Sequence, residues 1–109
     1  FNVQELETLV RQNLPIIVII ANNDSWGMIK SGQRVNFGKR YIDVDLPSNI
    51  DYAKIAEAFG CYGEKVTDPG EIKPALQRAV DSGKPAVIDV KIAWEIPKGT
   101  KLMMQLNLI

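Results

Sequence analysis

Residues 15–28, with the sequence Pro-Ile-Ile-Val-Ile-Ile-Ala-Asn-Asn-Asp-Ser-Trp-Gly-Met, contain the pattern that decides the fold of this chain. The apolar, mostly β-branched run at residues 16–20 is typical of a strand that is covered on both faces, as in a parallel sheet flanked by helices. Open sheets of that kind bind ligands just beyond the carboxyl ends of their strands. We therefore expect a ligand site in the residues that follow this strand.

The residues after the strand carry oxygen donors. Asn22 and Asn23 offer side-chain amide oxygens, Ser25 offers a backbone carbonyl, and Gly27 lets the chain pass close to a bound group. Mg²⁺ accepts such hard donors when it also holds a diphosphate. The same residues are ordinary turn formers, because short polar side chains bond to their own backbone. Local chemistry alone favours the turn, so the flanking sequence has to decide.

Helix and strand patterns alternate on both sides of this stretch. Asn2 is expected to cap a first helix, which Leu14 and Pro15 end. Asp51 is expected to cap a second helix, which Gly60 ends. Further strands are expected at residues 63–66 and 85–90. This alternation with short connections predicts a parallel α/β sheet.

A third helix is expected to start at Asp68 and Pro69 and to end at residues 82–83. Pro74 sits uneasily inside it, because proline removes a helical hydrogen bond, so a kinked or delayed start is expected. After Ile92 the tail keeps an apolar character. Its own domain or a neighbouring subunit or domain would have to cover the apolar residues Met103, Met104, Leu106, Leu108 and Ile109.

Residues 29–50 are rich in Gly, Lys, Arg and Asp, which predicts one long loop with short structure around residues 41–44. Asp43 and Asp45 are expected to be solvated rather than to act as an acid and base pair. A local basic cluster could meet an anionic substrate, although a solvated loop explains it as well. The cluster consists of Lys30, Arg34, Lys39 and Arg40.

Composition limits the classes of function. The 109 residues suit one small domain, and 13 basic against 13 acidic residues give no electrostatic reason to expect nucleic acid or an anionic membrane as partner. With no histidine and one cysteine, the chain can form no zinc site, Ser-His triad or Cys-His dyad. The single Cys61 excludes an internal disulfide and is expected to be a buried small hydrophobe. No apolar run approaches the ~20 residues of a membrane span and no basic signal-peptide start is present, which favours the cytoplasm.

Three motifs together resemble a known family. They are Asn2-Val-Gln-Glu-Leu-Glu-Thr8, Val10-Arg-Gln-Asn-Leu-Pro15 and Asn22-Asn-Asp-Ser-Trp-Gly-Met28. In this order, around the apolar strand, they resemble the second half of the signature of thiamine diphosphate (ThDP) enzymes. The resemblance continues through residues 51–61 and 83–90. It identifies residues 1–109 as a single partial ThDP pyrophosphate-binding domain, a C-terminal piece of a parallel α/β fold.

The resemblance implies two cofactors, ThDP and Mg²⁺. Asn23 would be the side-chain metal ligand and Ser25 the backbone-carbonyl ligand, while Trp26, Gly27 and Met28 would line the cofactor. Trp26 could equally be a core aromatic residue that anchors the loop, and Met28 a packing residue. The Gly-Asp-Gly that opens the family's motif would precede Phe1, and the pyrimidine-binding domain with its activating glutamate is also outside this sequence. We therefore expect no catalytic residue in this chain, and an inert isolated fragment.

The family relationship further implies an enzyme that cleaves or forms a carbon–carbon bond next to a carbonyl, acting on a 2-oxo acid or aldehyde. Acetolactate (acetohydroxyacid) synthases, benzaldehyde lyase and other carboligases, and 2-oxoacid decarboxylases all resemble this chain. The synthases have tryptophan where this chain has Gly32, which weakens that assignment. The remaining domains of a parent chain and further subunits of a homo-oligomer would be its partners. The alternative is a non-catalytic α/β assembly or interaction module, because such domains serve many functions.

Overall fold

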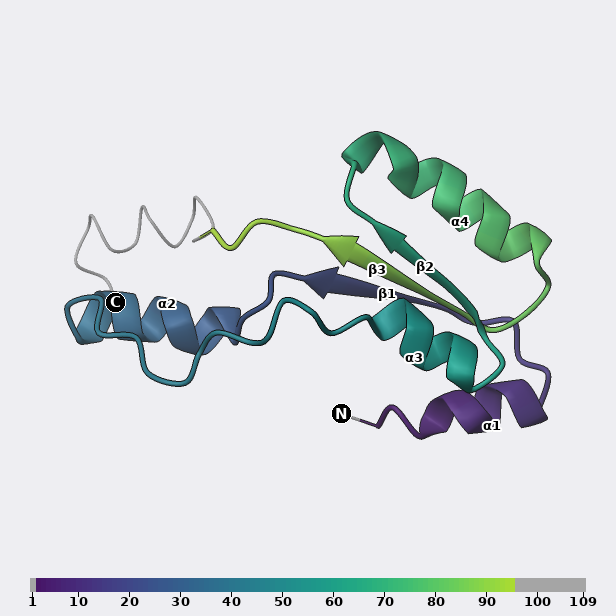
Figure 1. The fold of residues 1–109 in the computed structure, drawn as a ribbon, viewed down its shortest axis with the longest axis horizontal. Helices are drawn as coiled ribbons and strands as arrows, with labels where there is room; N and C mark the ends of the chain where they lie inside the picture. Colours follow the sequence, from purple (N-terminus) through teal and green to yellow (C-terminus); the bar gives the residue numbers. More distant parts are fainter. Residues whose placement is uncertain (1, 96–109) are drawn as a thin grey trace. The chain divides into compact units, whose positions relative to one another are not determined.

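The structure of this protein is a computed structural model that describes residues 2–95 (Figure 1). These residues belong to two compact units. The first unit comprises residues 2–22 and 49–92 and contains the sheet. The second comprises residues 23–48 together with 93–95. The apolar tail residues 103–109 lie outside the described part of the chain, so what covers them stays a prediction.

The first unit alternates helices with strands, as the sequence predicts. Three parallel strands form its sheet in the order β1-β3-β2, and the residue pairs Ile17 with Ala86 and Tyr62 with Ala86 fix the register. The expected α/β fold with a parallel sheet is thus confirmed. Its elements are α1 (Glu5–Arg11), β1 (Ile17–Asn22), α3 (Tyr52–Ala58), β2 (Tyr62–Val66), the 3₁₀ turn η1 (Pro69–Glu71), α4 (Ile72–Asp81) and β3 (Ala86–Lys91).

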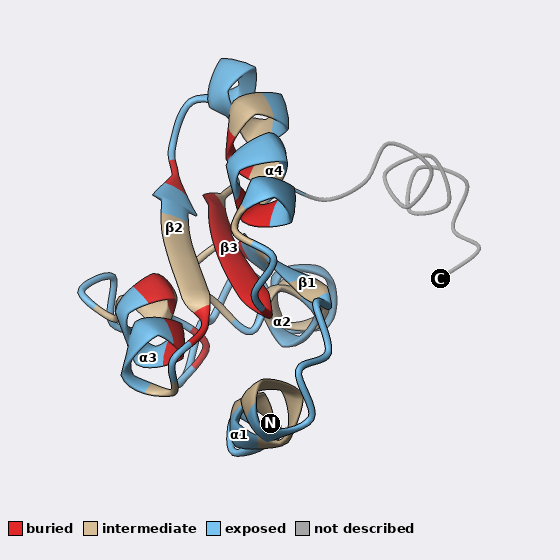
Figure 2. Ribbon diagram, turned by 90° about the vertical axis from the view of Figure 1, so that its right-hand side faces the viewer, coloured by how far each residue is buried: buried red, intermediate tan, exposed pale blue. Residues whose placement is uncertain are grey.

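Strand β3 lies at the centre of the core, and helices cover both of its faces (Figures 1 and 2). Ile88 packs on one face with Ala75 and Ala79 of α4. Val87 packs on the other face with Ala56 of α3 and with Cys61, while α1 contributes partly buried side chains there. Cys61 is buried, as predicted, and burial raises the pKa of its thiol.

The prediction that β1 is covered on both faces is wrong for the described residues. Val18 and Ile19 are 37% and 54% exposed, because β1 is an edge strand of the sheet that residues 2–95 form. The strand buried on both faces is β3, where every residue from Ala86 to Val90 is buried. An apolar run indicates that a strand can be buried. How much of the strand is covered depends on the elements that pack against it.

Side chains that bind the backbone define two helix starts. Asp51 accepts a hydrogen bond from the Lys54 amide at 3.0 Å and caps α3, which ends before Gly60 at a φ of 92°. Asp68 accepts from the Gly70 amide at 2.8 Å and begins η1, so α4 starts only at Ile72. Both expected caps and the delayed start near Pro74 are confirmed.

The expected cap at Asn2 is wrong. Helix α1 begins at Glu5 after Gln4, which makes no side-chain capping bond. Asn2 instead adopts a φ of 61°, and its backbone carbonyl accepts from the Glu5 amide at 3.0 Å. A tight turn at Asn2 therefore takes the place of the cap, because asparagine tolerates this left-handed conformation.

An ion pair between Arg78 of α4 and Glu64 of β2 should make the stability of the fold depend on pH. Arg78 binds Glu64 at 2.5 Å and holds the pKa of that carboxyl below its ordinary value of 4.5. Since the folded pKa is lowered, the pair stabilises the fold above the unfolded pKa and this contribution is lost as pH falls through the folded pKa. We expect Glu64→Gln to flatten the fall of the urea midpoint between neutral pH and pH 3. The control Glu7→Gln removes the exposed ion pair between Glu7 and Arg11 and should follow the wild type. Equal curves for all three proteins would contradict the prediction.

A fully buried carboxylate lies in the middle of β3. Asp89 is 0% exposed, and neither of its oxygens has a hydrogen-bond partner among the described residues. Burying polar oxygens without hydrogen-bond partners costs stability, so Asp89→Leu, which keeps the branching at Cγ but removes the oxygens, should raise the free energy of unfolding by about 1 kcal/mol or more. Urea denaturation of the two proteins measures the difference. A loss of stability would show that the carboxylate has a stabilising partner.

Candidate functional site

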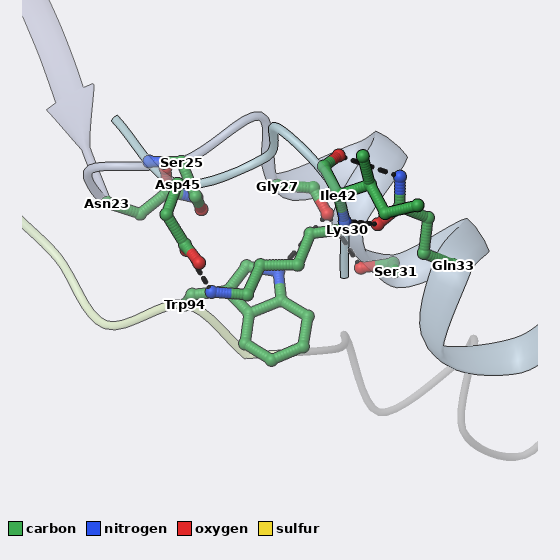
Figure 3. A network of polar contacts seen from close by, with 9 residues as sticks. All are labelled: Asn23, Ser25, Gly27, Lys30, Ser31, Gln33, Ile42, Asp45 and Trp94. Carbon is green, nitrogen blue, oxygen red and sulfur yellow. Dashed lines mark hydrogen bonds and ion pairs between the residues drawn. The ribbon is translucent and has the colours of Figure 1, made fainter. Parts of the chain in front are cut away.

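The second unit begins directly after β1 in the chain and contains a helix that the sequence analysis missed. Residues 29–50 are not one long loop, because α2 spans Gly27–Asn36. Methionine, lysine, glutamine and arginine have good helix propensity, and these residues outweigh Gly32. Ser31 Oγ also donates to the Gly27 carbonyl at 2.8 Å, within the helix (Figure 3).

The loop of residues 23–26 has an ordered internal turn. Asn23 Oδ1 accepts a hydrogen bond from the Ser25 amide at 3.1 Å (Figure 3). The turn chemistry that the sequence indicates is therefore present, and it fixes the direction of the Asn23 side chain. An amide oxygen has two lone pairs, so this bond leaves Asn23 Oδ1 able to bind a second group. The turn and a ligand site are thus compatible.

A second stretch, residues 44–46, holds this loop from outside, and we call it the bracing segment. The Trp26 amide donates to the Val44 carbonyl and the Leu46 amide donates to the Asp24 carbonyl, both at 2.8 Å. These two bonds place Ser25 opposite Asp45 in an antiparallel bridge. Ser25 is the non-hydrogen-bonded member of this ladder, so its own carbonyl points away from the bracing segment.

Ser25 has a feature that is unusual for a surface loop. Its hydroxyl oxygen is buried and has no hydrogen-bond partner among residues 2–95. Buried polar atoms are nearly always paired in native proteins, so an unpaired one suggests a missing water, ion or ligand. Amide, hydroxyl and carbonyl oxygens thus occur together within three residues, and they suit a hard cation.

Gly27 is required by close packing in this site. A Cβ atom at this position would lie 2.6 Å from Asn23 Nδ2 and 3.2 Å from Trp94 Cδ1. The glycine therefore lets the first turn of α2 pack against the side chains of both Asn23 and Trp94. These contacts are with the chain's own side chains, so the expected approach of Gly27 to a bound group stays a prediction.

Trp94 is the main residue that sequence reasoning missed. Its indole Nε1 donates to the Gly27 carbonyl at 3.1 Å. The Lys30 ammonium lies 4.8 Å from the Trp94 ring and 5.5 Å from the Tyr41 ring, and it forms an ion pair with Asp45 (Figure 3). A lone tryptophan just after a strand was the only signal in the sequence, and nothing there paired it with residues more than sixty positions earlier.

The prediction for the basic cluster is wrong at Lys30, whereas the prediction for the acidic pair holds. The Lys30 side chain is only 17% exposed, so its interpretation as a solvated loop residue is wrong, whereas its partner Asp45 is 67% exposed, as predicted. Arg34 lies on α2 with its guanidinium 5.9 Å from the Trp94 ring. Lys39 and Arg40 are exposed, as a solvated cluster predicts.

The other predicted site residues divide into buried and exposed ones. Asn22 is 8% exposed, and its carbonyl accepts from the Ile92 amide at 2.9 Å, which agrees with a structural role at the end of β1. Trp26 is 45% exposed and Met28 is 89% exposed, so neither belongs to the hydrophobic core. The interpretation of Trp26 as a core anchor is wrong. Both side chains are accessible to a ligand or partner.

Other kinds of site find no support in the described part of the chain. Residues 2–95 contain no cluster of three or more His, Cys, Asp or Glu side chains that could bind a metal. A metal here would therefore need amide and backbone oxygens of the sort that residues 23–25 provide. Within the same residues, no helix combines the length and apolar character needed to cross a membrane.

The fold and the loop define a parallel α/β domain with oxygen donors directly after its first strand. Residues 1–90 match the family described as thiamine pyrophosphate enzyme, C-terminal TPP binding domain. The chain belongs to this family. Thiamine pyrophosphate is the same compound as ThDP, so the cofactor class expected from the sequence is confirmed.

Individual relatives agree with this family. YdaP of Bacillus subtilis, named as a thiamine pyrophosphate-containing protein, is 42% identical over 91% of this chain and 17% of its own length. The acetolactate synthase isozyme 2 large subunit of Escherichia coli is 34% identical over 84% of this chain and 17% of its own. The crystal structure of benzoylformate decarboxylase from Polynucleobacter necessarius matches 89% of this chain and 18% of its own, with a TM-score of 0.79 and 27% identity. The chain thus spans less than a fifth of the proteins it matches.

Proposed function

We propose that this chain is the part of a larger Mg²⁺-dependent ThDP enzyme that holds the cofactor's diphosphate. The observation that carries the proposal is the loop of residues 23–26, in which an oriented amide and an unpaired buried hydroxyl occur together. Asn23 would bind Mg²⁺ through Oδ1 and Ser25 through its carbonyl oxygen. Their local geometry supports this assignment, because the Ser25 carbonyl points away from the bracing segment.

The start of α2 supports a diphosphate next to this metal. The helix has no side-chain cap and no acidic residue in its first turn. Its free N–H groups and the positive end of its dipole favour an anion there. Gly27 would let the phosphates approach the backbone, and Trp26 and Met28 would flank the cofactor as exposed apolar contacts.

The proposed reaction makes or breaks a carbon–carbon bond next to a carbonyl, as in an acetolactate synthase-like carboligase or a 2-oxoacid decarboxylase. When bound, ThDP supplies the nucleophilic carbon that attacks a 2-oxo acid or an aldehyde. The residues of this chain bind and orient; none of them transfers a proton or attacks the substrate. Catalytic groups would come from other domains of the parent chain, in a cytoplasmic homo-oligomer.

A binding experiment on the full-length protein tests the proposal. Calorimetric titration with ThDP should show tight binding only when Mg²⁺ is present, and the loaded protein should consume pyruvate or another 2-oxo acid. The 109-residue chain alone should not decarboxylate pyruvate. ThDP binding that is unaffected by removing Mg²⁺ with a chelator would contradict the metal site, and pyruvate turnover by the short chain would contradict its inert role.

A non-catalytic assembly module is the second candidate, and the surface of the second unit favours it. Met28 and Phe37 are 89% and 67% exposed. An open hollow of about 290 Å³ lies nearby in the same unit, lined by Gln33, Phe37, Arg40 and Ile42. Exposed apolar surface of this kind often marks a protein contact. Self-association of the chain that ignores ThDP and Mg²⁺ would favour the module, whereas stabilisation by both would favour the enzyme.

A further inference from the structure

We infer that Trp94 is a positioning residue for the loop that carries Asn23 and Ser25. This inference rests on the proposed function, since it concerns the two residues proposed as metal ligands. Trp94 would touch neither the metal nor the substrate. It would act by fixing the loop from two directions, through Gly27 and through Lys30.

The first connection runs through Gly27. The Trp94 indole N–H donates to the Gly27 carbonyl at 3.1 Å, and its ring lies close enough that a Cβ at Gly27 would be 3.2 Å from Cδ1. The Asn23 amide packs at the same place, since that Cβ would be 2.6 Å from Nδ2. A shift of Gly27 therefore changes the space available to Asn23.

The second connection runs through Lys30. Its ammonium lies 4.8 Å from the Trp94 ring, and its ion pair with Asp45 ties the helix to the bracing segment. The backbone of Asp45 lies opposite Ser25 in the antiparallel bridge. Because the Lys30 side chain is only 17% exposed, its contact with the ring is less screened than that of a surface cation, whereas the carboxylate of its partner is 67% exposed. Through Lys30 and Asp45, Trp94 thus also fixes the bracing segment that holds Ser25.

Two properties of the full-length protein test this role. The first is hydrogen exchange of residues 22–28 in the absence of cofactor, and the second is the dissociation constant for Mg²⁺ at saturating ThDP. Trp94→Phe keeps an aromatic ring but loses the N–H donor, and Trp94→Leu loses both. We expect faster exchange in both variants. The Mg²⁺ dissociation constant should rise roughly 5-fold in Trp94→Phe, as for one lost hydrogen bond, and further in Trp94→Leu.

The matched control is Tyr62→Phe, which removes the hydroxyl that binds Glu64 at 2.5 Å in the first unit. It should leave both properties unchanged. If Tyr62→Phe changes them as much as Trp94→Phe does, the effect is general destabilisation and the inference fails. If the wild type binds Mg²⁺ and ThDP while Trp94→Phe behaves identically, only the inference fails. A wild type that binds neither cofactor overturns the proposed function and the inference with it.

Discussion

Replacing Gly63 by alanine should strongly destabilise the first unit. A Cβ atom there would lie 2.2 Å from the Ala53 carbonyl oxygen and 2.9 Å from the Ala53 carbonyl carbon. Both atoms belong to the backbone of α3, so relief requires the helix to move away from β2. We expect a loss of about 3 kcal/mol in the free energy of unfolding, measured by urea denaturation followed by circular dichroism.

Gly32→Ala provides the control with the same chemical change. A Cβ at Gly32 would meet no atom within 4 Å, and the residue lies inside α2. Alanine is the better helix former, so this variant should gain roughly 0.5–1 kcal/mol. If the two alanine variants have equal stability, α3 does not pack on Gly63 as closely as the structure indicates.

Replacing Asn23 by alanine should have the largest effect on cofactor binding. The change removes Oδ1, which is both the proposed metal ligand and the acceptor for the Ser25 amide at 3.1 Å. Loss of supporting groups around a metal costs about 10- to 100-fold in affinity, so loss of a ligand should weaken Mg²⁺ binding at least as much. Titration of the full-length protein with Mg²⁺ at saturating ThDP measures the change.

Asn36→Ala is the matched control, because Asn36 is an exposed residue at the end of α2. It should bind Mg²⁺ as the wild type does. Asn23→Asp should keep much of the affinity, since a carboxylate supplies the same oxygen with added charge. Wild-type affinity in Asn23→Ala would exclude Asn23 as a ligand and leave its role as a turn former.

The sequence predicted the elements of the first unit well, because their signals are local. Asp51 and Asp68 cap their helices through contacts within three residues, and Gly60 ends α3 by its own backbone conformation. The prediction failed at α2 because its charged residues and glycines were taken as loop composition. Helix propensity over ten residues was the better guide there.

The candidate site shows the same division. The Asn-Asn-Asp-Ser-Trp-Gly stretch indicated which oxygens could bind a metal, since the residue types and their order can be read directly from the sequence. It could not indicate what holds them in place. The Ser25 bridge to Asp45 and the bond from Trp94 to Gly27 join residues that are far apart in sequence.

By itself, the sequence determined the parallel α/β class and the cofactor family and supplied the candidate oxygen donors of the loop, because strand composition, capping and motif order act over short distances. Only the tertiary structure decided that β3 rather than β1 is the buried strand, that Gly63 must lack a side chain, and that Lys30 is shielded beside Trp94. Burial and close approach depend on which distant segments meet. The sequence of one segment does not specify which distant segments pack against it, so these properties appear only in the folded chain.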